Sequence, residues 1–186
     1  MKTTYQLKVA GVERDLILCP INEELKIGAF ILFGDVDLTV SCAKELLKLA
    51  PKHDIMITAE SKGIPLICEM ARQNNENDYV VARKGPKLYM KNIITTEVDS
   101  ITTAKKQVLC IGEKEASLLR DRDVLIVDDV ISTGESLRAI ETLVKQVGGN
   151  IVGKMAVLAE GDAAEREDII FLEKLPLFDK DGNQIQ

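Results

Sequence analysis

Apolar and polar residues alternate in short runs over the first 35 positions of the chain. Two such runs, Tyr5 to Val9 and Asp15 to Leu18, are separated by a glycine, and this spacing predicts a small β-hairpin. Leu25 to Phe33 is a further apolar stretch, which we expect to form a strand. The pattern then changes after Asp35, a suitable N-cap. Apolar positions recur at helical spacing and predict a helix over Val36 to Leu49.

The rest of the chain alternates between short apolar runs and helical patterns. We expect strands at Asp54 to Thr58, Tyr79 to Ala82, Val108 to Ile111, Val124 to Val127 and Ile151 to Leu158. We expect helices at Ile64 to Arg72, Lys114 to Leu119 and Glu135 to Val147. The segments that connect the expected strands are too long for hairpin turns and contain helices. They therefore predict parallel strands joined by right-handed crossovers. In such sheets ligands bind beyond the carboxyl ends of the strands.

Length, charge and composition narrow the class of protein. The 186 residues suit a single domain over residues 1–186, and a net charge of −6 with 4% aromatic residues argues against a nucleic-acid partner. The one histidine, His53, excludes zinc sites that need two His ligands. Four cysteines without a C-x-x-C pair are expected to be buried thiols in a reducing compartment. Without a secretion signal or an apolar run of the ~18 residues that span a membrane, we expect a cytoplasmic protein with no membrane partner.

The strongest functional signal is the segment VLIVDDVISTGES, Val124 to Ser136. Four apolar residues lead into two acids, Asp128 and Asp129, and a short loop then opens a helix. The residues that open this helix are Ser132, Thr133, Gly134, Glu135 and Ser136. Backbone N–H groups at a helix N-terminus, beside hydroxyl groups, suit a phosphate, and carboxylates accept hydrogen bonds from vicinal hydroxyl groups. Together these groups indicate a site for a ribose 5-phosphate.

Two other interpretations of this segment are open. The acid pair can merely cap a strand–turn–helix junction, although the two halves at this spacing after a buried strand are more specific than that. A phospho-acceptor receiver domain also carries an acid pair in a doubly wound fold. Its pair lies near the N-terminus, however, whereas here the pair follows two thirds of the chain.

The same segment resembles the phosphoribosyl pyrophosphate (PRPP) motif of the type I phosphoribosyltransferases. The resemblance implies an α/β fold with a central, mostly parallel sheet flanked by helices. It also implies a small N-terminal hood at about residues 1–35, followed by a core at about residues 36–175. In this family the two acids, here Asp128 and Asp129, bind the ribose hydroxyl groups. The Thr-Gly loop, here Ser132 to Ser136, binds the 5-phosphate.

Two further segments resemble family motifs that bind the diphosphate of PRPP. TAESKGIPL, from Thr58 to Leu66, is similar to the pyrophosphate loop. VVARKGPKLYM, from Val80 to Met90, resembles the Arg-Lys-x-x-Lys run of the adenine and xanthine enzymes. The resemblance implies that PRPP is bound by Glu60, Ser61, Lys62, Gly63, Arg83, Lys84 and Lys87. Three cations in the second segment of an otherwise acidic chain also indicate an anion site by themselves.

A polar, threonine-rich stretch from Asn92 to Ile111 matches the family's flexible catalytic loop in position and length. In the family this loop closes over PRPP and excludes water from the reacting centre. The resemblance assigns a catalytic role to Glu97 in this loop, together with Asp128 and Asp129.

The resemblance implies an enzyme that transfers the 5-phosphoribosyl group from PRPP to a purine and releases diphosphate. Mg²⁺ is the expected cofactor, held through PRPP and not directly by protein ligands. Ser132 stands where the oxopurine enzymes carry a third acid. Leu32 stands in the base-binding hood, where the xanthine group uses Asn. Both departures favour adenine as the nucleobase.

Enzymes of the adenine/xanthine subgroup are usually homodimers, so the resemblance also implies a homodimer. Two alternative functions stay open. The chain could be a PRPP-sensing regulatory protein without turnover, or a phosphoribosyltransferase that acts on another base such as xanthine or orotate.

Overall fold

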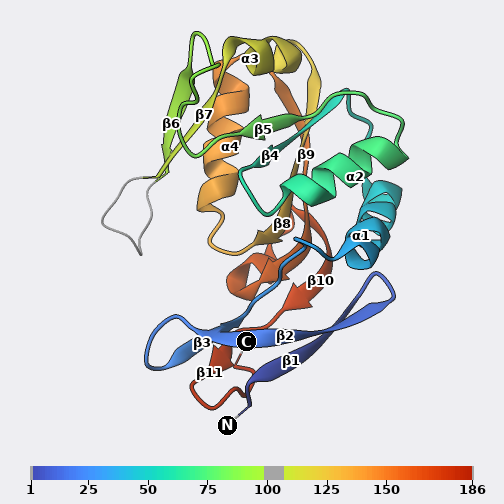
Figure 1. Cartoon of the computed structure of the whole chain (residues 1–186), viewed down its shortest axis with the longest axis vertical. Coiled ribbons are helices and arrows are strands. Elements are labelled where there is room, and N and C mark those ends of the chain that lie inside the picture. Colours follow the sequence, from blue (N-terminus) through green and yellow to red (C-terminus); the bar gives the residue numbers. More distant parts are fainter. Residues whose placement is uncertain (1, 99–106, 186) are drawn as a thin grey trace.

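A five-stranded core sheet forms the centre of the computed structural model, which describes residues 2–98 and 107–185 (Figure 1). The strand order is β10-β9-β8-β4-β5, and every neighbouring pair is parallel. The bounds of these strands are β4 (Ile55–Ala59), β5 (Val80–Ala82), β8 (Asp123–Ile131), β9 (Asn150–Glu160) and β10 (Ile170–Leu175). The predicted α/β fold with a central parallel sheet is therefore confirmed.

Helices cover both faces of this sheet, because both faces of its strands are apolar. Helices α1 (Val36–Leu49) and α2 (Ile64–Gln73) pack on one face, and α3 (Glu113–Leu119) and α4 (Glu135–Gln146) pack on the other. Along β8, Val124 and Ile126 join the apolar cluster of α3 and α4, whereas Leu125 joins that of α1 and α2. This alternation is the two-residue period of a strand. Each fully buried aliphatic side chain contributes about 1.5–3 kcal/mol to folding.

A smaller antiparallel sheet, the hood, lies at one end of the core (Figure 1). Its strands, in spatial order, are β1 (Thr4–Val9), β2 (Val12–Pro20), β3 (Leu25–Gly28) and β11 (Phe178–Asp179). Ala10 and Gly11 both have positive φ, as a two-residue hairpin turn between β1 and β2 requires. The predicted hairpin is confirmed, but β10 and β11 were not predicted. The C-terminal segment completes the hood by pairing β11 with β3.

The expected strand over Leu25 to Phe33 is only partly correct, because β3 ends at Gly28. Phe30 and Leu32 are buried beyond that point, while Ile31 and Phe33 are exposed. Residues 30–33 therefore alternate between buried and exposed side chains although they no longer pair with a neighbouring strand. The apolar pattern here reflects burial of every second residue, but the strand predicted from it ends at Gly28. Helix α1 then begins as expected, because the carboxylate of Asp35 accepts a hydrogen bond from the Leu38 amide.

Three further elements flank the core sheet. Strands β6 (Ile94–Val98) and β7 (Gln107–Ile111) pair antiparallel, and β7 contains the strand expected at Val108 to Ile111. The 3-10 helix η1 (Gly161–Glu165) follows β9. Within the described ranges, no helix has both the length and the apolar character needed to cross a bilayer.

Candidate active site

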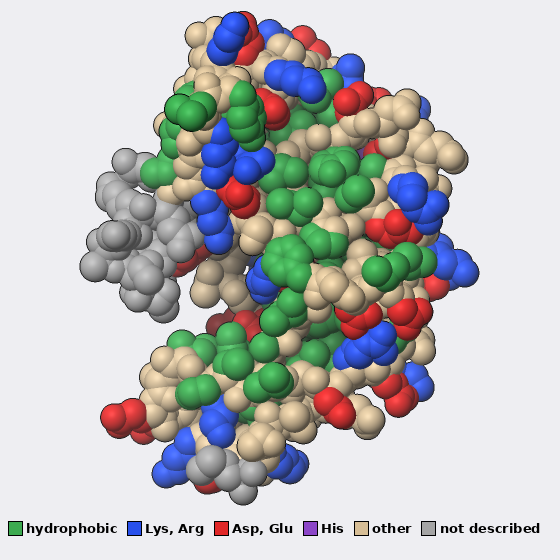
Figure 2. All heavy atoms as spheres, in the orientation of Figure 1, with side chains coloured by type: hydrophobic (Ala, Val, Ile, Leu, Met, Phe, Trp, Pro, Cys, Tyr) green, Lys and Arg blue, Asp and Glu red, His purple; other side chains and the backbone are tan. Residues whose placement is uncertain are grey.

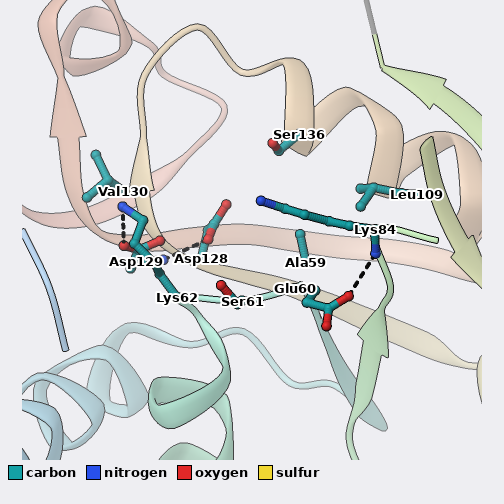
Figure 3. A pocket seen from close by; sticks show the side chains of 10 residues that line it. All are labelled: Ala59, Glu60, Ser61, Lys62, Lys84, Leu109, Asp128, Asp129, Val130 and Ser136. Carbon is teal, nitrogen blue, oxygen red and sulfur yellow. Dashed lines mark hydrogen bonds and ion pairs between the residues drawn. The ribbon is translucent and has the colours of Figure 1, made fainter. Parts of the chain in front are cut away.

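A pocket opens at the carboxyl ends of β4, β5 and β8, where a parallel sheet is expected to bind ligands. The surface is hollowed between the hood and the core in Figure 2, and Figure 3 shows the pocket from close by. Its volume is about 160 Å³. The residues that line it are Ala59, Glu60, Ser61, Lys62, Lys84, Leu109, Asp128, Asp129, Val130 and Ser136.

The two acids at the floor of this pocket lie on strand β8. The strand expected at Val124 to Val127 is longer than predicted, because β8 stays paired with β9 through both acids and as far as Ile131. The long strand β9 supplies a backbone partner for this extension. Strand geometry turns successive side chains to opposite sides, so Asp129 is 4% exposed and Asp128 is half-buried.

The two carboxylates differ in their partners. Asp129 forms an ion pair with Lys62, with 2.9 Å between Nζ and Oδ2. The carboxylate of Asp128 accepts a hydrogen bond of 2.9 Å from the Asp129 amide. Burial raises the pKa of Asp128 well above its ordinary value, and the neighbouring charge of Asp129 raises it further. Two adjacent acceptors of this kind suit the hydroxyl groups of a sugar.

The loop after β4 passes very close to the acid pair. A Cβ atom added to Gly63 would lie 2.3 Å from the Thr58 hydroxyl and 3.3 Å from the Asp128 carboxylate. Only glycine allows this approach. The peptide bond between Glu60 and Ser61 in this loop is cis. The loop places Lys62 beside Asp129 and Glu60 beside the residues that follow β5.

The cations that follow β5 gather around the carboxylate of Glu60. It accepts a hydrogen bond of 2.9 Å from the Lys84 amide. Its oxygens also lie 3.2 Å from Nη2 of Arg83 and 3.7 Å from Nζ of Lys87. The Lys84 amide and the charges of Arg83 and Lys87 lower the pKa of Glu60 below its ordinary value. In the free protein, Glu60 thus binds the groups of Arg83, Lys84 and Lys87 that were expected to bind the diphosphate.

The ammonium group of Lys84 is placed differently from the other cations. Its side chain lies across the pocket, toward Asp128 and Ser136 (Figure 3). Among the described residues it forms no ion pair with a carboxylate. An anion in the pocket can therefore contact this ammonium group without displacing a carboxylate of the described residues.

A second pocket of about 60 Å³ lies beside the first and is formed by the loop that opens α4. It brings together the predicted residues Ser132 to Ser136 and is shared with Asp128. Gly134 is the N-cap of α4 and has φ of +75°, a left-handed conformation that favours glycine. The amides at the start of α4 and the helix dipole suit a phosphate group.

Four of the predicted residues are not in the lining of either pocket: Gly63, Arg83 and Lys87, which lie at the edge of the main pocket in the loops described above, and Leu32. Leu32 is 1% exposed and packs in the cluster of α1 and α2, so its side chain lines neither pocket. The backbone of Glu97 lies in β6, paired with Val108, but its side chain is outside the described part of the chain. The tip of the predicted catalytic loop, residues 99–106, is likewise outside the described residues.

Sequence reasoning missed Arg166, which lies against Gly134 although it is distant in the chain. It also missed the apolar wall of the main pocket, formed by Ala59, Leu109 and Val130. No local signal marks these residues. They lie at the two pockets only because the folded sheet brings together segments that are far apart in the chain.

Comparisons with known proteins agree with this geometry. The profile of the phosphoribosyl transferase domain matches residues 41–180. Xanthine phosphoribosyltransferase of Bacillus licheniformis is 28% identical over 153 residues, which cover 80% of this chain and 77% of that protein. Adenine phosphoribosyltransferase of Kosmotoga olearia is 29% identical over 126 residues, which cover 67% and 69%.

A solved structure of similar fold is that of adenine phosphoribosyltransferase from Thermoanaerobacter pseudethanolicus. Its TM-score is 0.71 at 22% identity, over 86% of this chain and 95% of that one. At this identity the likeness concerns the fold.

Proposed function

We propose that this chain, which belongs to the phosphoribosyl transferase family, transfers the 5-phosphoribosyl group of PRPP to a nitrogen of a purine base. Diphosphate is the leaving group. The observation that carries the proposal is the placement of the acid pair Asp128 and Asp129 in one cleft with two candidate anion sites. One anion site is formed by the cations at the ends of β4 and β5, and the other by the loop that opens α4. Relatives that act on xanthine and on adenine support a purine acceptor.

The acid pair and the α4 loop hold the ribose 5-phosphate in this proposal. Asp128 and Asp129 accept hydrogen bonds from the ribose hydroxyl groups, and the amides of Ser132 to Ser136 bind the 5-phosphate. The ribose ring gains positive charge as its bond to diphosphate breaks. Carboxylates fixed beside the ring stabilise that charge.

The opposite side of the pocket binds the diphosphate. Its donors are Lys62, Lys84, Arg83 and Lys87, with the loop amides around Ser61 and Gly63. Negative charge develops on the diphosphate as the bond breaks, and cations already in place stabilise it without reorganisation. Three of these four cations have a carboxylate partner in the free protein, so PRPP has to take over those interactions.

Mg²⁺ is the cofactor that this chemistry implies, and the residues present fit it. Among the described residues no group of three or more metal-ligating side chains is found. An ion held through PRPP would take its ligands from substrate oxygens and water, as hard cations of this kind do, and needs no such group of protein ligands. When bound, the ion neutralises charge on the diphosphate.

Adenine is the acceptor we propose. Ser132 at the α4 loop provides a hydroxyl group where the oxopurine enzymes place an acid, and this departure supports a 6-aminopurine. Ile31 and Phe33 are exposed on the segment that joins the hood to α1, so this segment offers apolar surface. Leu32 is buried there, and the second sequence argument for adenine loses its basis.

We also propose a homodimer in the cytoplasm. Leu88 and Tyr89 follow Lys87 and are largely exposed, although both are apolar over most of their surface. A second copy of the chain could cover them. Light scattering should give about twice the monomer mass of 20.5 kDa.

The experiment that tests the function is a panel of nucleobases with PRPP and Mg²⁺, read out as diphosphate release. We expect turnover of adenine above that of xanthine, hypoxanthine, guanine and uracil. The matched control is the double variant Asp128→Asn and Asp129→Asn, which should fold and show no turnover. Preferential use of hypoxanthine or guanine would contradict the Ser132 argument. Tight PRPP binding without turnover of any base would favour a sensing function.

A further inference from the structure

A cation from a distant part of the chain lies beside the α4 loop. Arg166 directly follows η1, close to the start of β10. A Cβ atom added to Gly134 would lie 2.7 Å from Nη1 of Arg166 and 4.0 Å from its Cζ. The guanidinium group therefore packs directly against the one residue of the loop with left-handed backbone among those described.

A chain of ion pairs holds Arg166 in this position. Its Nε and Nη2 donate to the two oxygens of Asp168 at 2.9 and 2.8 Å. Asp168 also pairs with Lys154 on β9, and Lys154 pairs with Glu141 on α4 at 2.9 Å. A bidentate pair fixes the plane of a guanidinium group. The network therefore ties Arg166 to the helix that carries the loop and directs Nη1 at Gly134.

The loop itself supplies no cation for a phosphate. Its residues, Ser132 to Ser136, include one charged side chain, the acid Glu135. A phosphate monoester carries nearly two negative charges at pH 7. Backbone amides attract it, but they leave that charge and the charge of Glu135 without a counter-ion. Arg166 is the positive group nearest to Gly134, and Arg138 approaches the same point at 3.9 Å.

We infer that Arg166 is a positioning residue for the 5-phosphate. It supports Gly134 from outside the loop and presents Nη1, the guanidinium nitrogen that does not bind Asp168, behind the bound phosphate. Arg166 is not among the residues that line the loop pocket, so it acts through the loop and not by contact with the substrate. The inference rests on the proposed function, because it assigns a role at the 5-phosphate site.

The test measures ribose 5-phosphate and diphosphate binding by calorimetry. We expect Arg166→Ala to weaken ribose 5-phosphate binding about tenfold, equivalent to about 1.4 kcal/mol, and to leave diphosphate binding within about twofold. The matched control is Arg138→Ala, which removes a neighbouring cation without an Asp168 partner and should change either affinity less than about threefold. In turnover, KM for PRPP should rise while kcat is kept, because the lost interaction is equal in ground and transition states.

Several results would overturn the inference. They are an unchanged ribose 5-phosphate affinity in folded Arg166→Ala, an equal loss in Arg138→Ala, and a parallel loss of both ligands. If Arg166→Ala does not fold, Arg166→Lys decides, because lysine keeps the charge but loses the fork to Asp168. A loss confined to ribose 5-phosphate then supports the inference, and no loss overturns it. A wild-type chain that binds neither ligand overturns the proposed function and this inference with it.

Discussion

The two anion sites of the cleft are built from different groups. The site at the ends of β4 and β5 uses charged side chains, and Glu60 and Asp129 neutralise most of them in the free protein. The site at the start of α4 uses backbone amides, with Arg166 held outside the loop by Asp168. In the proposed reaction the first site holds diphosphate only until its bond to the ribose breaks, while the second holds the 5-phosphate both of PRPP and of the nucleotide product. Glu60 and Asp129 compete with diphosphate for the same cations. We therefore expect them to weaken diphosphate binding and to favour its release.

The largest expected effect comes from breaking the backbone site. Gly134→Val places a branched side chain at φ of +75°, where its Cβ would lie 2.7 Å from Nη1 of Arg166. We expect ribose 5-phosphate affinity to fall by roughly a hundredfold or more. Diphosphate affinity should stay within about twofold, because its donors are on other loops. Calorimetric titration with ribose 5-phosphate and with diphosphate measures the two affinities.

Gly148→Val is the matched control for that variant. Gly148 also has positive φ, +82°, and follows the opposite end of α4, where a Cβ atom would meet only the Arg120 side chain at 4.0 Å. The control should lower stability and leave ribose 5-phosphate affinity unchanged. If both variants lost this affinity equally, general strain in α4 would explain the result and the loop assignment would be wrong.

A smaller effect, of opposite sign, is expected at the charged site. Glu60→Gln removes the carboxylate that competes with diphosphate for Arg83, Lys87 and the Lys84 amide. We expect diphosphate to bind about fivefold tighter, equivalent to about 1 kcal/mol, and the gain to shrink at high salt. Calorimetry at two salt concentrations measures both effects.

The companion variant is Lys84→Met, which removes the ammonium group that lies across the pocket without a carboxylate partner among the described residues. It should weaken diphosphate binding about tenfold. Weaker binding in Glu60→Gln as well would mean that Glu60 holds the cations in place for the ligand, and the competition between them would be refuted.

The smallest expected effect is on stability. The pKa of Asp128 is raised in the folded protein, so the folded state holds this proton more tightly than the unfolded state. Its contribution to stability is therefore present below the ordinary pKa and is lost as pH rises through the raised value. Asp128→Asn should raise Tm by a few degrees, about 2–4 °C per kcal/mol, at neutral pH.

The pH dependence separates this cause from others. At acidic pH, where Asp128 is protonated in both states, the difference in Tm between the two proteins should vanish. Asp129→Asn is the control, since it breaks the ion pair with Lys62 and should not stabilise the protein. An Asp128→Asn protein less stable than wild type at pH 7 would count against burial of this charge as the cause.

Much of the fold and of the candidate site could be predicted from residue patterns. The apolar run before Asp128 and the helical spacing after Glu135 indicated a strand and a helix, and both are present. Gly134 was placed in the loop that opens this helix, and it is the N-cap of α4 with φ of +75°. These predictions succeeded because a buried strand, a helix N-terminus and a left-handed turn each impose local requirements on residue type.

Other features depended on contacts between distant segments, which local patterns do not report. Strand β8 continues past its acids because β9 offers it a partner. The alternating segment around Leu32 buries that residue instead of presenting it to a base, because α1 and the hood pack over it. The short strand β11 exists because β3 lies open beside it.

The sequence by itself determined the alternation of strands and helices through most of the core, the acid pair and the glycine-containing loop, because these follow from local chemistry. The tertiary structure alone decided which charges meet. Glu60 faces Arg83 and Lys87 because β4 and β5 end side by side, and Arg166 reaches Gly134 because β9 and η1 bring it back over the start of α4. Charge pairing depends on distances of a few ångströms between residues far apart in the chain, and only the packed sheet sets those distances.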